Sequence, residues 1–425
     1  VIGGPFNPET GRRPFFGQPR SRLASAAVGD QFCGCSDREA GSWARTGTGG
    51  RVTVASGPGD DEAMENSVAV MPICRRWFAD ASVQITPFAA TGYSGSRVLA
   101  VRGPDDARYV LKSFHAGTSR EHVAWVHRLA RHLRAEGVTQ VAEVVPDRDG
   151  ETVVADAAGT LWELCRFMPG VAVCRPDTRQ AAAAAETLAV LHLAAARLPG
   201  AWPRKSRSPG LVRRIEQARG LRAVPWELRR DAVRRAGVHP SRSQAALVAE
   251  VARRFDDAIE VFSEARGAQA VERIARLQPA AMSVQPVLRD IWCDHVLHAA
   301  PDAAEVTGII DLHAAGIDTP ATDIARLLGS WGVSGGCAAL SPGERYPRAI
   351  ESYERVRPLD PYERRLIGLL HRTAVIFGLD NWFRWTMEDH REFPDAARVL
   401  GRIDRLLQEL RPAVEGLADR EGIVD

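Results

Sequence analysis

The sequence predicts an α+β protein in which a small β-rich lobe precedes a larger, mostly helical lobe. From Asp177 onward, apolar residues recur mainly with the spacing of helices. Before that point, five short runs have the apolar or alternating composition of strands: 83–88, 97–101, 109–114, 152–155 and 161–167. A loop-and-strand stretch at 286–328 interrupts the helical part, and the rest of the chain is organised around it.

Two shifts in composition divide the chain. Residues 1–70 are rich in Gly, Arg, Ser and Asp and show no lasting apolar period, so we expect a disordered or poorly ordered extension. Residues 71–167 form the predicted β-rich N-lobe, and residues 168–425 form the predicted helical C-lobe.

Composition narrows the class of protein. The 425 residues carry 55 Lys and Arg against 53 Asp and Glu, a net charge of +2, so the whole chain favours neither nucleic acid nor a membrane as partner. Seven cysteines, an odd number in a large chain, indicate a reduced, cytoplasmic protein. The longest apolar run, 181–196, is interrupted by Glu186 and His192 and is shorter than the roughly 20 residues of a membrane helix.

Asp290 and Asp311 mark the central stretch. Asp290 lies between apolar segments within 287–297, and Asp311 follows the apolar run 308–310. They are 21 positions apart (290 to 311), with a turn at 300–302 between them. This layout suits a loop and a hairpin that hold two carboxylates together. Phosphoryl transfer uses such a pair, one carboxylate to orient the attacking hydroxyl and one to hold Mg²⁺. The alternative is that both are turn aspartates.

A Gly- and Ser-containing loop lies between the first two predicted strands. Gly92, Ser94 and Gly95 allow the main chain to approach an anion closely, as in a flap over phosphates, although an ordinary hairpin turn has the same composition. Lys112 follows in the next strand among apolar neighbours. A strand lysine can lie on a solvated face or bind phosphate. Glu121, in the first turn of the next predicted helix, is the expected partner of Lys112 or a complement to the helix dipole.

These features together resemble the aminoglycoside phosphotransferase and choline kinase-like family. The stretch from Asp311 to Asp323, with a Gly, a Pro and then Asp-Ile-Ala opening a helix, is similar to the family sequence after its metal-binding aspartate. Asp290 and His295 have the spacing of the family's catalytic-loop Asp and Asn. Asp323 is expected to satisfy free N–H groups at the start of its helix.

The resemblance implies a bilobal protein-kinase-like fold with a nucleotide in the cleft and transfer of the γ-phosphoryl of ATP or GTP to a hydroxyl of a small molecule. Asp290 would be the base, and Arg289 would add positive charge at the phosphates. Asp311 would hold Mg²⁺, and Lys112 would neutralise phosphate charge. The passage from 161–167 into 168–170 resembles the hinge between lobes, where the main chain of Glu163 and Cys165 would contact the base of the nucleotide.

His295 is the main departure from the family, which has Asn at this place. Imidazole is a poorer ligand for Mg²⁺ than an amide oxygen and is better suited to Mn²⁺. His295 therefore either contributes to the metal site or indicates a nucleotide-binding relative without transfer activity. His313, where the family has a small residue, favours the second alternative.

A basic run covers residues 204–235, with eleven Lys and Arg against three acids. Its simplest interpretation is a solvated helical face. A surface that attracts an anionic substrate or nucleic acid is the other, and Trp226 alone supplies no aromatic interleaving for base stacking. In the family this region shapes the acceptor site, so we expect it to decide which small molecule is bound.

Overall fold

The computed structural model describes residues 70–79, 83–87, 96–104, 106–236, 244–331, 342–393 and 395–419. The predicted extension 1–70 lies outside these residues except for its last position, as does the Gly/Ser loop with Gly92, Ser94 and Gly95. The division into an extension, an N-lobe and a C-lobe at these boundaries stays a prediction.

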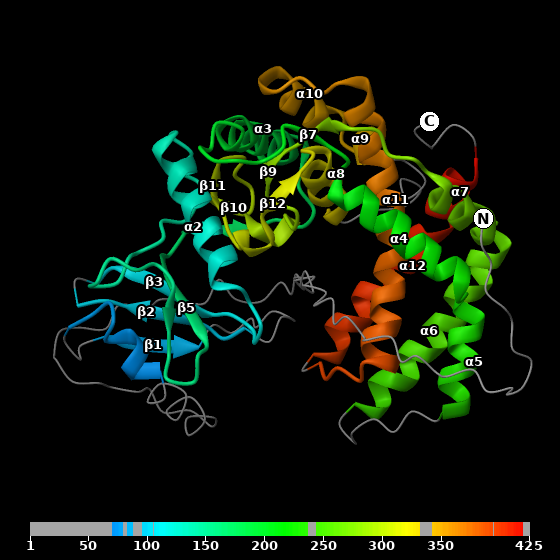
Figure 1. Ribbon diagram of the computed structural model, residues 1–425, viewed down its shortest axis with the longest axis horizontal. Coiled ribbons are helices and arrows are strands. Elements are labelled where there is room, and N and C mark those ends of the chain that lie inside the picture. The colour runs from blue at the N-terminus through cyan, green and yellow to red at the C-terminus, as the bar shows by residue number, and fades with distance from the viewer. Residues whose placement is uncertain are drawn as a thin grey trace, which may run out of the picture.

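A five-stranded antiparallel sheet forms the N-lobe, with the strand order β1-β2-β3-β5-β4. Its strands are β1 (Gln84–Pro87), β2 (Val98–Arg102), β3 (Arg108–Ser113), β4 (Val154–Ala155) and β5 (Leu161–Arg166). The helix α2 (Arg120–Ala135) joins β3 to the rest of the lobe and rises from the sheet toward the C-lobe (Figure 1). Ser119 caps α2 by accepting a hydrogen bond from the N–H of His122.

The C-lobe is mostly helical, as its apolar spacing predicts, and lies on the other side of the molecule in Figure 1. The amphipathic stretch 245–275 forms two of these helices, α6 and α7. The helices are α3 (Thr178–Ala195), α4 (Pro209–Ala223), α5 (Trp226–Ala236), α6 (Ala245–Glu264), α7 (Gly267–Arg276), α8 (Ala321–Ser330), α9 (Pro342–Arg345), α10 (Pro347–Val356), α11 (Pro361–Phe383), the π-helical turn η4 (Arg384–Glu388) and α12 (Ala396–Ala418).

Short strands interrupt this helical lobe where the sequence predicts its central stretch. β10 and β11 form an antiparallel hairpin, β6 extends it, and β9 pairs with β12. The elements are β6 (Val171–Ala172), β7 (Lys205–Ser206), β8 (Met282–Ser283), β9 (Gln285–Val287), β10 (Val296–His298), β11 (Val306–Ile309) and β12 (Gly316–Asp318), with 3₁₀ turns η1 (Cys293–His295) and η2 (Leu312–Ala314).

The described residues form three clusters of buried apolar side chains, a large one in the C-lobe that includes part of α2 and two smaller ones in the N-lobe. Leu99, Leu111 and Leu164 bury one face of the N-lobe sheet, and the helix at 70–74 packs against it. The C-lobe cluster is the largest of the three, and it includes the buried aromatic residues Trp382, Phe383 and Trp385. None of the helices in the described ranges is both long and apolar enough to cross a bilayer.

Candidate active site

Asp290 lies in the loop between β9 and β10. Two side chains of α8 form hydrogen bonds with this loop. The Asp323 carboxylate accepts hydrogen bonds from the main-chain N–H of Leu288 at 2.7 Å and of Arg289 at 2.6 Å. Arg326 lies one turn further along the same helix and donates from Nη2 to Asp290 Oδ1 at 2.5 Å. One face of α8 therefore fixes both the main chain of the loop and its carboxylate.

The role of Asp323 differs from the one that the sequence predicts. α8 begins at Ala321, two residues before Asp323, and the carboxylate accepts hydrogen bonds from the main chain of the β9–β10 loop. Asp323 is fully buried and also accepts from, or pairs with, His192 Nε2 on α3 at 2.9 Å. His192 is thus the hydrogen-bonded core residue that its apolar helix indicates.

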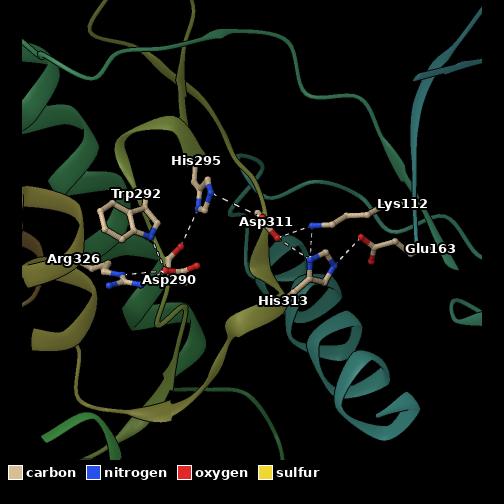
Figure 2. A network of polar contacts seen from close by, with 8 residues as sticks. All are labelled: Lys112, Glu163, Asp290, Trp292, His295, Asp311, His313 and Arg326. Atoms are coloured by element: carbon tan, nitrogen blue, oxygen red, sulfur yellow. Dashed lines mark hydrogen bonds and ion pairs between the residues drawn. The ribbon is translucent and has the colours of Figure 1, made fainter. Parts of the chain in front are cut away.

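Trp292 also contacts the Asp290 carboxylate. Its indole Nε1 donates to Asp290 Oδ1 at 2.6 Å. Its ring contacts the guanidinium groups of Arg326 and Arg402, whose Cζ atoms are 4.2 Å and 4.3 Å from its centroid. These two contacts restrict the ring, and the ring in turn orients the Asp290 carboxylate. Figure 2 shows Trp292 and Arg326 converging on Asp290 from the same side.

Arg289 has a left-handed main chain, with φ of 66°. Non-glycine residues adopt this conformation at a cost, and they do so most often at functional sites. The Arg289 guanidinium lies over Gly316 in β12, where an added Cβ would come within 2.3 Å of Nη1. Gly316 is therefore required for this position of the arginine.

Asp311 follows β11 and also has a left-handed main chain, with φ of 61°. Its Oδ1 accepts a hydrogen bond from Lys112 Nζ at 2.8 Å and contacts His313 Nδ1 at 2.7 Å. Burial by itself would raise the pKa of Asp311, but Lys112 and His313 outweigh it and hold that pKa well below its ordinary range. The carboxylate is therefore ionised, as a metal ligand must be.

The predicted pairing of Lys112 with Glu121 is wrong. Glu121 is exposed at the start of α2 and accepts a hydrogen bond from Ser119. The carboxylate near Lys112 within the N-lobe is Glu163, which stands directly opposite Lys112 in the β3–β5 register. Opposite residues of an antiparallel pair project from the same face, so the two side chains enter the cleft together.

His313 links these charges into one network (Figure 2). Its Nε2 bonds Glu163 at 2.8 Å and its Nδ1 lies 2.9 Å from Lys112, while His127 on α2 bonds the other oxygen of Glu163 at 2.7 Å. Burial and the Lys112 ammonium oppose protonation of His313, but Glu163 and Asp311 outweigh them and raise its pKa. Sequence reasoning missed His127 and this role of His313.

The strand register also corrects the predicted hinge contacts. Phe114 N–H bonds Leu161 O and Phe167 N–H bonds Arg108 O, so the alternation of the ladder directs the main-chain groups of Glu163 and Cys165 at β3. They are not available to a nucleotide base. Met168 follows the ladder, and no hydrogen bond to its main chain occurs among the described residues.

His295 lies between the two aspartates. Its Nδ1 contacts the main-chain oxygen of Asp290 at 2.9 Å, which makes Nδ1 the protonated nitrogen and leaves the lone pair on Nε2. That Nε2 faces Asp311 Oδ2 at 4.0 Å, too far for a hydrogen bond. Asp311 and His295 are therefore the two side chains that would hold a divalent ion here.

Asp311 and His295 therefore suit a divalent ion whose remaining ligands come from water or from nucleotide phosphates. In the described part of the chain, no three His, Cys, Asp or Glu side chains form a cluster that could hold a metal alone. Mg²⁺ in nucleotide sites is commonly bound by one or two protein groups together with phosphates and water. Asp311 with His295 meets that requirement, and Asp290 stands on the other side of His295.

The fold and this geometry define a class of protein, and comparison with known proteins agrees. The chain is a small-molecule kinase with a hydroxyl acceptor. It belongs to the phosphotransferase enzyme family, whose model matches residues 85–359. The resemblance stated from the motifs and the bilobal kinase-like fold are both confirmed.

Two homoserine kinases are among the relatives. The enzyme of Xanthobacter autotrophicus is 24% identical over 273 residues, which are 63% of this chain and 71% of that protein. The enzyme of Brucella anthropi is 25% identical over 283 residues, or 65% of this chain and 73% of that protein.

Solved structures show the same fold at lower identity. An amicoumacin kinase, solved with AMP-PNP, Ca²⁺ and its ligand, has a TM-score of 0.52 and 17% identity, covering 82% of this chain and 95% of its own. A spectinomycin phosphotransferase, solved with ADP and spectinomycin, has a TM-score of 0.55 and 12% identity, covering 82% and 98%.

Proposed function

We propose that this kinase transfers the γ-phosphoryl of ATP or GTP to a hydroxyl of a small molecule, with Asp290 as the base and Asp311 as the metal ligand. The observation that supports it best is the order of groups across the cleft: Asp290, His295, Asp311, Lys112. A base at one end, a metal site in the middle and a phosphate-binding cation at the other end follow the path of the transferred group.

The nucleotide would displace the contact between Lys112 and Asp311. Lys112 would then pair with phosphate oxygens, and Asp311 with His295 would hold Mg²⁺ or Mn²⁺, which would neutralise charge as the phosphoryl group moves. Met168, whose main chain is not used by the sheet, would contact the base in place of Glu163 and Cys165. Gly92, Ser94 and Gly95 keep their predicted role of covering the phosphates.

The test is turnover. ADP or GDP formation should require a divalent ion and a hydroxylated acceptor, and L-homoserine, spectinomycin and amicoumacin are the acceptors to try first because the relatives' names supply them. Transfer to any acceptor in the panel, with the phosphorylated product identified by mass, supports the proposal.

A second candidate is a nucleotide-binding protein without transfer activity. The observation that favours it is the pairing of Asp290 with Arg326, because a guanidinium bound to a carboxylate competes with an incoming hydroxyl. Nucleotide binding that stabilises the protein in the presence of Mg²⁺, with no nucleotide hydrolysis or transfer across the panel, would establish this candidate instead.

Asp311→Asn should weaken metal-dependent nucleotide binding by at least about tenfold, or 1.4 kcal/mol. The amide still offers an oxygen to Lys112, but it lacks the negative charge that a divalent ion requires. Calorimetric titration with AMP-PNP, with and without Mg²⁺, measures the effect. Equal metal dependence in the variant and the wild type would remove Asp311 from the metal site.

His295→Asn should shift the ratio of Mn²⁺-supported to Mg²⁺-supported activity toward Mg²⁺. The variant restores an amide oxygen, a harder ligand than imidazole nitrogen, at the position that faces Asp311. Steady-state rates with each ion give the ratio for both proteins. If the ratio is the same in both, His295 supports the loop through its bond to Asp290 O and does not bind metal.

A further inference from the structure

A hollow of about 120 Å³ lies beside the catalytic loop and is lined mainly by α4, α8 and α11. Four arginines line it, two from α4, one from the loop and one from α8: Arg213, Arg214, Arg289 and Arg326. Arg326 connects it directly to Asp290, the proposed base. A group bound in this hollow would therefore belong to the molecule whose hydroxyl reaches Asp290.

The charges in the hollow do not balance. Asp318 is the one carboxylate in its described lining, and Asp290 behind it is paired with Arg326, so four arginines face two acids. The Asp318 oxygens already accept hydrogen bonds from Ser208, Thr319 and Gly210, and burial raises the pKa of this carboxyl. Asp318 therefore compensates the charge of the four arginines only in part.

Two of the four guanidinium groups have no ion pair or hydrogen bond among the described residues, Arg213 at the exposed rim and the half-buried Arg289. Partial burial and the like charges of Arg289 and Arg326 lower the pKa of Arg213, even though Asp318 partly offsets them. Arginines that repel one another across a hollow are stabilised by an anion between them, and a guanidinium fork matches a carboxylate or a phosphate.

A hydroxyl in the same hollow also lacks a partner. Thr322 Oγ1 is buried beside Gly210 and forms no hydrogen bond within the part of the chain that the structure describes. A buried polar atom without a partner is unfavourable unless a ligand or water supplies one. Thr322 comes from α8, as Arg326 does, so both groups are presented by the helix that also fixes the catalytic loop.

We propose that the acceptor of this kinase carries an anionic group, a carboxylate or a phosphate, in addition to its hydroxyl, and that the hollow lined by Arg213, Arg289 and Thr322 binds that group. This inference rests on the proposed function, because it assigns the hollow to the acceptor. It gives the basic run at 204–235 a specific meaning, since Arg213 and Arg214 belong to that run. A polycationic acceptor would be repelled by the same charges.

The experiment uses two pairs of acceptors that differ in charge. 4-Hydroxybutyrate and 4-hydroxybutanamide have nearly the same shape, and glycerol 3-phosphate and glycerol differ by the phosphate group. Binding of each compound to the AMP-PNP-loaded protein is measured by calorimetry, and kcat/KM is measured with ATP. The anionic member of at least one pair should bind at least about tenfold more tightly, since a hydrogen bond to a charged group contributes about 1.5–3 kcal/mol. If the first pair shows this difference, the hollow binds a carboxylate, and if the second pair shows it, the hollow binds a phosphate.

Three variants locate the effect. Arg213→Gln should raise KM for the preferred anion by about tenfold, leave kcat nearly unchanged and leave its neutral partner unaffected. Thr322→Val removes the unpartnered hydroxyl with little change of shape and should act in the same direction. Arg222→Gln is the control, because it removes a positive charge from the far end of α4, where Arg222 pairs with Glu272 at the surface.

The outcomes separate the two proposals. If no anion binds more tightly than its neutral partner, or if Arg213→Gln and Arg222→Gln behave alike, the anionic acceptor is excluded while transfer to a neutral hydroxyl can still be observed. If an anion binds in an Arg213-dependent way but no phosphorylated product forms with any acceptor, the hollow is supported and the transfer function is not.

Discussion

Asp290→Asn should abolish phosphoryl transfer and leave nucleotide affinity almost unchanged. The amide oxygen can still accept hydrogen bonds from Arg326 and Trp292, so the loop should keep its shape. It cannot take a proton from the acceptor hydroxyl, and loss of a general base lowers kcat by about 10²–10⁴-fold. Single-turnover transfer and AMP-PNP titration measure the two quantities on the same preparation.

The control for this variant is Asp302→Asn. It makes the same chemical change at an exposed aspartate in the turn between β10 and β11, whose side chain forms no hydrogen bond or ion pair among the described residues. Wild-type turnover is expected there. If Asp290→Asn also turned over at the wild-type rate, Asp290 would not be the base, and the catalytic assignment would be wrong.

Much of the fold follows from local patterns in the sequence. Alternation along β2, β3 and β5 predicts the N-lobe strands because one face of that sheet is buried under Val70, Ile73 and Trp77. Helical spacing predicts α6, α7, α10, α11 and α12 because each buries one stripe in a common core. The ends are less well predicted. Helical spacing is clear over 361–377 and 396–410, whereas packing extends α11 to Phe383 and α12 to Ala418.

The sequence predicts only the part of the site whose residues lie close together along the chain. Asp290, His295 and Asp311 lie on one loop and the hairpin that follows it, so their proximity follows from spacing. The partner of Lys112 depends on how β3 and β5 pair and on where α2 packs. That is why Glu121, the first acid after Lys112 in the sequence, is not its partner, and why Glu163, 51 positions away (112 to 163), stands opposite Lys112.

The contacts of α8 illustrate the same limit. Asp323 and Arg326 are three residues apart, a spacing that places them on one face of a helix. That spacing predicts a shared target but does not identify it. Only the packing of α8 against the β9–β10 loop shows that the target is the main chain at Leu288 and Arg289 together with the side chain of Asp290.

Asp323→Ala should destabilise the protein and slow transfer at temperatures where it is still folded. Removing the carboxylate leaves His192 and two main-chain N–H groups of the catalytic loop without their acceptor in a fully buried place. Breaking such a buried network costs about 3–5 kcal/mol, a large part of the net stability of a domain. Thermal unfolding with and without AMP-PNP, followed by kcat well below the melting temperature, measures both effects.

The value of kcat in the folded variant distinguishes a purely structural role of Asp323 from a role in positioning Asp290. If Asp323 sets the loop that carries Asp290, kcat should fall in the folded variant while AMP-PNP affinity stays close to wild type, because Asp323 has no contact with Lys112 or Asp311 among the described residues. Asp302→Ala is the matched control and should change neither stability nor rate. If the destabilised Asp323→Ala protein kept the wild-type kcat, Asp323 would have a structural role only. Arg326 and Trp292 would then be the groups that position Asp290.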